Sequence, residues 1–281
     1  MTRRLFLVAA YDPQDIVGAS LVYYVRALAR CGDVVLAADS DFPQSELRKL
    51  DPYVLHSQAG RHREYDFGSY KRAWEWASGN PDVASYDYVY LVNDSVFGPL
   101  GEIEGCLRRM EESGKQAFAL VLNPHRKAPH LQSWFIGTTK AVFLSQWFDA
   151  FLRSVERQED KVAVCKIYET GFTELLKANA LEYCGLFEIA GRGIYNKPLK
   201  LCRSGLPFLK KNSVTRHCGS LAFHTRRILE NCPAECREAV LDDIKRILGE
   251  DAVKSLMSAG RLRCVARYLK YLAGKVFRRS A

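Results

Sequence analysis

The chain has 281 residues, 48% of them hydrophobic and 26% charged, a balance typical of a globular protein and unlike that of a disordered one. No apolar run approaches the roughly 18 residues of a membrane-spanning helix, and the apolar residues at 5–10 are too few for a secretory signal. Nine cysteines without a disulfide-like spacing indicate reduced thiols, so we expect a cytoplasmic protein.

The net charge of +9 belongs mainly to the end of the chain. Residues 261–281 hold seven basic side chains and no acidic one, which leaves 34 basic and 32 acidic side chains in the first 260 residues. The body of the protein is therefore nearly neutral. The basic tail alone motivates a nucleic-acid-binding function, but no RNA-binding signature accompanies it, and we expect no nucleic-acid partner.

The first part of the sequence alternates between strand and helix patterns. Buried strands are predicted at 5–10, 34–38 and 53–56. The first helix is predicted to begin with Asp12 as its N-cap and Pro13 in its first turn, and to end at Gly32. This rhythm favours right-handed crossovers within a largely parallel sheet.

A polar loop that becomes an aromatic-rich helix follows at residues 61–77. Asp66 and Gly68 lie near the start of this helix, and Trp74 lies within it. Asp66 could be the N-cap and Trp74 a core anchor. Neither role would prevent a contact with a ligand.

The stretch after residue 87 holds the first candidate for function. Residues 88–92 form a short, β-branched and apolar run, typical of a strand that is buried on both faces. Asn93-Asp94-Ser95 follows, before Gly98-Pro99 ends any central strand. Asp94 thus lies at the carboxyl end of a buried strand, where open α/β sheets bind their ligands. The alternative is that the three polar residues are ordinary turn and capping chemistry.

A second polar cluster is predicted after the strand at 117–122. The loop from 123 to 130 leads into a predicted strand at 131–137, and alternation would place His130 and Gln132 on one face and Ser133 on the other. We expect the first pair to face an acceptor substrate. The alternative is that these groups satisfy hydrogen bonds at a strand end.

The predicted helix at 168–176 carries Glu169 in its first turn, where a carboxylate ordinarily complements the helix dipole.

From residue 226 onward the pattern is helical, so we expect one domain at 1–225 and a helical appendage at 226–281. Zinc is disfavoured near this boundary, because the spacing of the candidate ligands fits no established ligand pair; they are His217, Cys218, His224, Cys232 and Cys236.

Residues 261–279 are predicted to form an amphipathic helix on an anionic membrane surface. One face carries Leu262, Val265, Ala266, Leu269, Leu272, Ala273 and Val276, and the remainder carries Arg263, Arg267, Lys270 and Arg278. The alternative is that the apolar face packs on the core of the protein and the charges are merely solvated.

Four segments in order resemble the rhamnan synthesis protein F family of bacterial cell-surface polysaccharide synthesis: Tyr65–Lys71, Asn93–Pro99, His130–Phe135 and Tyr168–Thr173. The resemblance extends over roughly residues 3–212. It implies a GT-A-like α/β fold, that of the nucleotide-diphospho-sugar transferases, with a mostly parallel sheet flanked by helices.

By this resemblance Asn93-Asp94-Ser95 stands where such enzymes carry the DXD motif, whose carboxylates hold a divalent cation, Mg²⁺ or Mn²⁺, on the donor diphosphate. Asp39 would meet the nucleoside, Asp66 would be a second donor-side acid, and Glu169 the general base. Asp94 is the single carboxylate of the motif here, and magnesium can bind through one or two carboxylates plus phosphate oxygens.

The resemblance therefore implies an inverting glycosyltransferase. It would transfer a sugar, rhamnose from dTDP-rhamnose, to a polysaccharide or lipid-linked glycan acceptor, at the inner face of the cytoplasmic membrane. The alternative, motivated by the single carboxylate at Asp94, is a catalytically silent carbohydrate-binding or scaffold protein in the same pathway.

Overall fold

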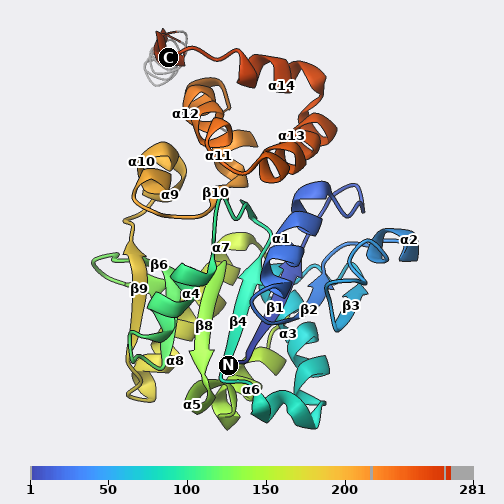
Figure 1. Cartoon of the computed structure of the whole chain (residues 1–281). Helices are drawn as coiled ribbons and strands as arrows, with labels where there is room; N and C mark the ends of the chain where they lie inside the picture. Colours follow the sequence, from blue (N-terminus) through green and yellow to red (C-terminus); the bar gives the residue numbers. More distant parts are fainter. Residues whose placement is uncertain (1, 216–217, 263, 267–281) are drawn as a thin grey trace. The chain divides into compact units, whose positions relative to one another are not determined.

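The computed structural model describes every residue except 1, 216–217, 263 and 267–281 (Figure 1). Its contacts divide the chain into two compact units. The first consists of Met1–Val17, Leu21–Asp94 and Glu102–Gly191, and the second of Gly18–Ser20, Ser95–Gly101 and Arg192–Ala281. None of the described helices is long and apolar enough to cross a membrane.

An eight-stranded sheet organises the first unit (Figure 1). Its strands are β1 (Arg4–Ala10), β2 (Asp33–Ala38), β3 (His56–Ala59), β4 (Tyr88–Asn93), β6 (Ala117–Asn123), β7 (His130–Leu131), β8 (Phe135–Thr139) and β9 (Tyr183–Glu188). Their order is β3-β2-β1-β4-β8-β6-β7, and β9 pairs with β6. The first four strands run parallel, and β8 is antiparallel to both of its neighbours.

Helices cover the sheet and bury both of its faces. They are α1 (Ala19–Ala29), α2 (Gln44–Leu47), α3 (Tyr65–Ser78), η1 (Pro81–Ser85), α4 (Glu104–Glu111), α5 (Lys140–Phe143), α6 (Gln146–Arg153), α7 (Lys161–Val164), η2 (Cys165–Thr170) and α8 (Gly171–Ala178). Every residue of β1 is buried, as expected for a strand that is covered on both sides. This arrangement confirms the predicted α/β class with a mostly parallel sheet flanked by helices.

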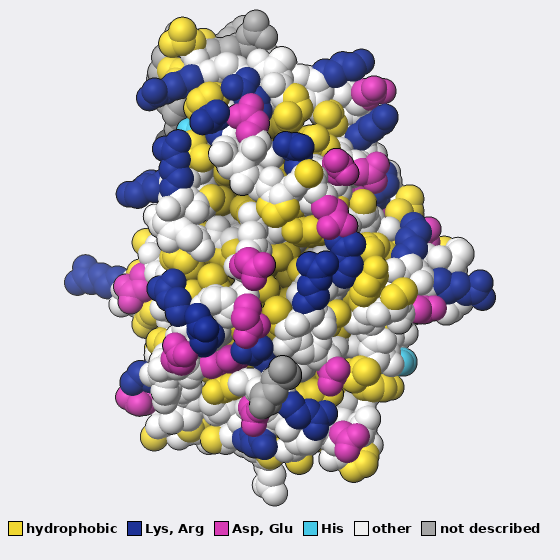
Figure 2. Space-filling model, in the orientation of Figure 1, with side chains coloured by type: hydrophobic (Ala, Val, Ile, Leu, Met, Phe, Trp, Pro, Cys, Tyr) yellow, Lys and Arg dark blue, Asp and Glu magenta, His cyan; other side chains and the backbone are white. Residues whose placement is uncertain are grey.

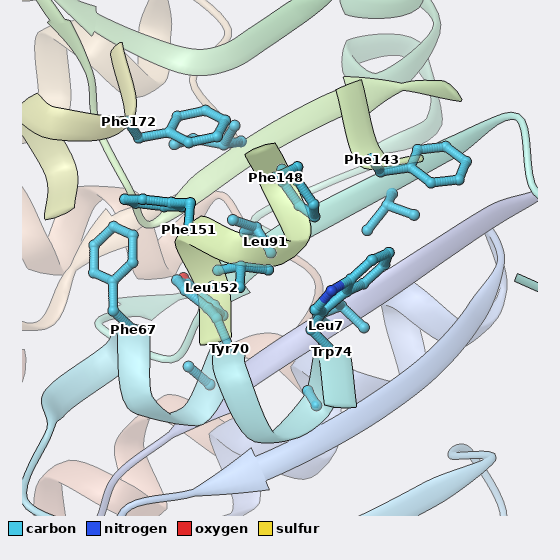
Figure 3. Packing of buried hydrophobic residues seen from close by; sticks show 14 of the residues in the cluster. Leu7, Phe67, Tyr70, Trp74, Leu91, Phe143, Phe148, Phe151, Leu152 and Phe172 are labelled. Carbon is cyan, nitrogen blue, oxygen red and sulfur yellow. The ribbon is translucent and has the colours of Figure 1, made fainter. Parts of the chain in front are cut away.

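A core of buried hydrophobic residues lies between the sheet and helices α3, α6 and α8 (Figure 3). Trp74 of α3 meets Phe148 of α6 edge to face, with ring centroids 5.1 Å apart, and its indole nitrogen donates to Asp149 Oδ1 at 2.9 Å. Phe151 and Phe172 extend this aromatic cluster toward α8. The predicted anchoring role of Trp74 is therefore confirmed.

Arg4 organises the opposite face at the start of β1. Its guanidinium donates to Glu111 at 2.5 and 2.8 Å and to Glu104 at 3.0 and 3.1 Å, and the Tyr90 hydroxyl donates to Glu111 at 2.6 Å. A buried charge is tolerated only when it is paired and hydrogen-bonded in this way. The network ties the first strand to α4.

Four sequence-based boundaries in this unit are wrong. The helix predicted at 168–176 is part of a helical run that begins with α7 at Lys161 and passes through η2 into α8. The first helix begins at Ala19, because Asp12 accepts a hydrogen bond from the Gln14 N–H at 2.9 Å and closes a turn. The third strand begins only at His56, since residues 51–53 form a turn. The strand predicted at 131–137 is interrupted between β7 and β8.

The second unit consists mainly of helices. They are α9 (Gly193–Asn196), α10 (Pro198–Arg203), α11 (Lys211–Thr215), α12 (Cys218–Glu230), α13 (Ala234–Leu248) and α14 (Glu250–Met257), beside a ribbon of β5 (Val96–Phe97) and β10 (Leu209–Lys210). The domain boundary at 225/226 stays a prediction; α12 runs across it. Most of the predicted tail helix at 261–279 lies outside the described residues.

Acidic and basic side chains are interspersed on the face drawn in Figure 2. This mixture agrees with the near-neutral balance of the first 260 residues.

Replacing Gly68 with alanine should lower the thermal midpoint. The added Cβ would lie 2.3 Å from the Glu64 Cβ and 2.7 Å from His62 Nδ1. Relieving such an overlap costs about 1–3 kcal/mol. Gly105→Ala is the matched control, because nothing lies within 4 Å of that position in α4 and alanine favours a helix. Equal midpoints in calorimetry for the two variants would contradict this packing argument.

Candidate active site

Polar residues gather where the parallel strands end. The carboxyl ends of β1, β2 and β4 meet at one edge of the sheet, because these strands run parallel and in register. The antiparallel strand β8 begins at the same edge, with Phe135 opposite Val92. Asp39, Asp94 and Ser133, which flank these strand ends, are thereby collected at one edge.

Asn93 links the end of β4 to the start of α3. Its side-chain amide donates to Asp66 Oδ2 at 2.8 Å, and its backbone N–H donates to the Trp134 carbonyl at 3.1 Å. The side chain is 1% exposed. Two of the predicted donor-side residues, Asn93 and Asp66, are therefore in direct contact, and Asp66 lies in the first turn of α3 without capping it.

Asp94 is half-buried, and its backbone N–H donates to the Ala9 carbonyl at 3.1 Å. Two buried phenols accompany the acids at this edge. Burial raises the pKa of Tyr24, and the charge of Asp94 raises it further; burial also raises the pKa of Tyr70, with a contribution from Asp66. Both phenols therefore stay protonated and can donate hydrogen bonds at neutral pH.

Neither tyrosine is among the predicted site residues. The sequence could have indicated Tyr70 as a site residue, because it lies four residues after Asp66 and thus on the same face of a helix. Its hydroxyl donates to the Ser133 carbonyl at 2.9 Å. Tyr70 thereby connects α3 to the start of β8.

The loop before α3 is held in a strained form around Asp39. Arg63 and Tyr65 have φ of 63° and 59°, a left-handed conformation that costs about 1–2 kcal/mol per non-glycine residue. The Arg63 N–H donates to Asp39 Oδ1 at 2.8 Å. Asp39 therefore fixes the loop that leads to Asp66.

His62 completes this loop as a neutral group. Burial, and then the charge of Arg72, lower the pKa of His62, although Asp39 lies 3.7 Å away. The Glu64 N–H donates to His62 Nδ1 at 3.1 Å, so Nε2 carries the hydrogen and donates to Ser69 at 3.0 Å.

Glu169 lies in the π-helical turn η2, a geometry often found at functional sites. Its Oε2 accepts hydrogen bonds from the Ser133 N–H at 2.8 Å and the Ser133 hydroxyl at 2.6 Å. His130 Nε2 lies 3.6 Å from Glu169 Oε1. The structure thus brings together three predicted site residues from β7, from the interruption before β8, and from η2.

The predicted division of the acceptor residues between two strand faces is wrong. Ser133 and His130 both meet Glu169, whereas Gln132 accepts a hydrogen bond from the Trp134 indole at 2.8 Å. The reason is the interruption between β7 and β8, which removes the alternation on which the prediction relied.

Ser95 belongs to the second unit. Its hydroxyl accepts a hydrogen bond at 2.8 Å from the ammonium group of Lys210, a residue that is 7% exposed.

The described residues contain no group of three or more His, Cys, Asp or Glu side chains that could hold a metal ion by themselves. A cation held by Asp94 would therefore need further ligands from outside these side chains, as Mg²⁺ bound through a single carboxylate does.

Comparison with known structures finds low overall similarity. A protein from Desulfovibrio desulfuricans G20 described as a nucleotide-diphospho-sugar transferase is 16% identical, with a TM-score of 0.43 and coverage of 85% of this chain and 99% of that one. A cytidylyltransferase from Leptospira borgpetersenii is 9% identical, with a TM-score of 0.42 and coverage of 92% and 98%. The mannosyltransferase Ktr4p from S. cerevisiae is 8% identical, with a TM-score of 0.34 and coverage of 54% of this chain and 59% of that one.

No curated protein matches the sequence. The model of one protein family does match, over residues 34–258. The matched region contains all four segments of the resemblance. It begins at residue 34, later than the expected start near residue 3, and continues past residue 212, where the resemblance was expected to end. Because this match covers about four fifths of the chain, the protein belongs to the rhamnan synthesis protein F family.

Proposed function

We propose that the protein is a glycosyltransferase of surface-polysaccharide synthesis that uses a nucleotide-sugar donor. Membership of the rhamnan synthesis protein F family supports a transferase. The observation that carries the proposal is the Glu169 carboxylate, which Ser133 holds through two hydrogen bonds at the edge of the sheet. A carboxylate fixed in this way is ready to take a proton from an acceptor hydroxyl.

The donor side is built from acids at the carboxyl ends of β2 and β4. Asp39 would meet the nucleoside, and Asp66, held by Asn93, would complete the donor side. Asp94 would hold a Mg²⁺ or Mn²⁺ ion on the diphosphate, and Ser95 would stand beside it. Such an ion neutralises the negative charge that develops on the leaving group.

The acceptor side is proposed around Glu169. His130 of β7 and Ser133 of the interruption lie beside this carboxylate, and Gln132 is the residue before Ser133. A single base acting on the acceptor hydroxyl corresponds to one displacement at the anomeric carbon, and hence to inversion. On the strength of the family, the donor is proposed to be dTDP-rhamnose and the acceptor a polysaccharide or lipid-linked glycan.

Replacing Glu169 with glutamine should reduce sugar transfer by about 100- to 10,000-fold, the usual contribution of a general base. Glutamine keeps the shape of the side chain but cannot accept the proton. Release of nucleoside diphosphate, measured over a panel of nucleotide sugars, reports the loss. Glu174→Gln is the matched control, because that carboxylate is exposed and paired with Lys177. Equal turnover by wild type and Glu169→Gln would remove Glu169 from the mechanism.

A nucleoside diphosphate should stabilise the protein more with Mn²⁺ or Mg²⁺ than without. Ligand at a hundredfold excess over Kd adds about 2.7 kcal/mol to the free energy of unfolding. The Asp94→Asn variant should lose the increment that depends on the cation, because its amide no longer offers a negative ligand. Thermal-shift measurements of the four combinations of nucleotide and cation provide the check. If no nucleotide stabilises the wild type, a catalytically silent carbohydrate-binding or scaffold protein becomes the leading hypothesis.

We further propose that the basic tail attaches the enzyme to the inner face of the cytoplasmic membrane, close to a lipid-linked acceptor. Leu262 and Val265, at the start of the apolar face, are 86% and 49% exposed. Each basic residue near an anionic surface contributes about 1 kcal/mol.

Full-length protein should therefore sediment with anionic vesicles at low salt. A variant with Arg263, Arg267, Lys270 and Arg278 replaced by glutamine should sediment far less, because about 4 kcal/mol of attraction is lost. Neutral vesicles and unchanged nucleotide binding are the controls. If wild type and variant sediment alike, the tail has no role at the membrane.

A further inference from the structure

The two oxygens of the Glu169 carboxylate have different surroundings. Oε2 accepts both hydrogen bonds from Ser133, at 2.8 and 2.6 Å. Oε1 lies 3.6 Å from His130 Nε2. Because Oε2 is occupied by two donors, Oε1 is the oxygen on which a transferred proton would arrive, beside the imidazole ring.

The Ala128 carbonyl fixes the tautomer of His130. This oxygen lies 2.8 Å from His130 Nδ1 and can only accept, so Nδ1 carries a hydrogen. In the neutral ring Nε2 therefore carries a lone pair and no hydrogen. The Asn123 side-chain nitrogen lies 3.5 Å from Nε2, and its N–H can donate to this lone pair, which favours the neutral ring before the reaction.

Two acceptors, Nε2 and Oε1, thus face each other. This arrangement is unfavourable while both lack a proton, and it becomes favourable when one proton is added. The pair is then a carboxylate beside an imidazolium, with the two facing atoms 3.6 Å apart.

We propose that His130 is a positioning residue that acts through Glu169 by holding the proton that leaves the acceptor hydroxyl. This inference rests on the proposed transferase function. The acceptor O–H bond breaks, and its electron pair forms the new bond to the anomeric carbon. The bond from that carbon to the diphosphate oxygen breaks, and the leaving group keeps the pair. The proton goes to Glu169 Oε1 and then to His130 Nε2. This transfer leaves Glu169 as a carboxylate and His130 as an imidazolium.

The surroundings of the ring favour this role. In the described part of the chain, the groups recorded in contact with it are Glu169 from η2, the uncharged Asn123 amide from β6 and the Ala128 carbonyl. Arg126 and Lys127, on the loop that leads to His130, oppose a positive charge, but both are exposed and screened by solvent. Among the described residues, Glu169 is therefore the charged group that lies against the ring.

Nuclear magnetic resonance of full-length protein with ¹⁵N-labelled histidine tests the pair without any substrate. His130, identified by the signals missing from His130→Gln, should carry its hydrogen on Nδ1, and His62 should carry it on Nε2. In Glu169→Gln the His130 Nε2 signal should change, because the carboxylate oxygen that faces this nitrogen becomes part of a neutral amide. A hydrogen fixed on Nε2 of neutral His130, or a signal unchanged in Glu169→Gln, would overturn the proposal.

Transfer assays test the catalytic consequence. His130→Ala should lose roughly ten- to a hundredfold in transfer, the low end for acid–base groups, and added imidazole should restore part of it. His125→Ala, an exposed residue of the same loop, is the matched control and should be unaffected. Full activity in His130→Ala, or a loss that imidazole does not restore, would leave His130 a packing role only. If the wild type transfers no sugar, the proposed function fails, while the resonance experiment still decides whether His130 holds the stated tautomer beside Glu169.

Discussion

A chain of hydrogen bonds along the carboxyl edge of the sheet holds the candidate site together. Asp66 of α3 accepts from Asn93 of β4, Tyr70 of α3 donates to the Ser133 carbonyl, and Ser133 donates twice to Glu169 of η2. These hydrogen bonds fix α3 to β4, and they fix both α3 and η2 to the segment around Ser133. Pre-organised polar groups of this kind need no rearrangement when charge develops in a reaction.

Desolvation gives this chain its strength. Asn93 and Tyr70 are almost fully buried, so their hydrogen bonds do not compete with water. Below them, the aromatic cluster of Trp74, Phe148 and Phe172 packs α3, α6 and α8 against the sheet. A shift of α3 would therefore disturb both the core and the acids, which couples the stability of the fold to the geometry of the site.

Regular buried elements were predictable from the sequence, and irregular ones were not. The strands β1, β2, β4 and β6 lie where apolar, β-branched runs indicated them, because burial on both faces demands that composition. The interruption at Gln132–Trp134 has no such signature. It depends on hydrogen bonds to residues far along the chain, such as the one from Ser133 to Glu169 36 residues later.

The sequence by itself determined that Asp39 and Asp94 stand at strand ends, since periodicity and composition are local properties. It placed Glu169 in the first turn of a helix, whereas the helical run begins at Lys161 and Glu169 lies within it, in η2. Only the tertiary structure decided which polar groups meet. Ser133 rather than Gln132 holds Glu169, Tyr24 and Tyr70 accompany the acids, and His130 is fixed in one tautomer by a carbonyl two residues away. Hydrogen-bond partners depend on distance and direction in space, and a strand that breaks after two residues turns its next side chains in directions that alternation cannot predict.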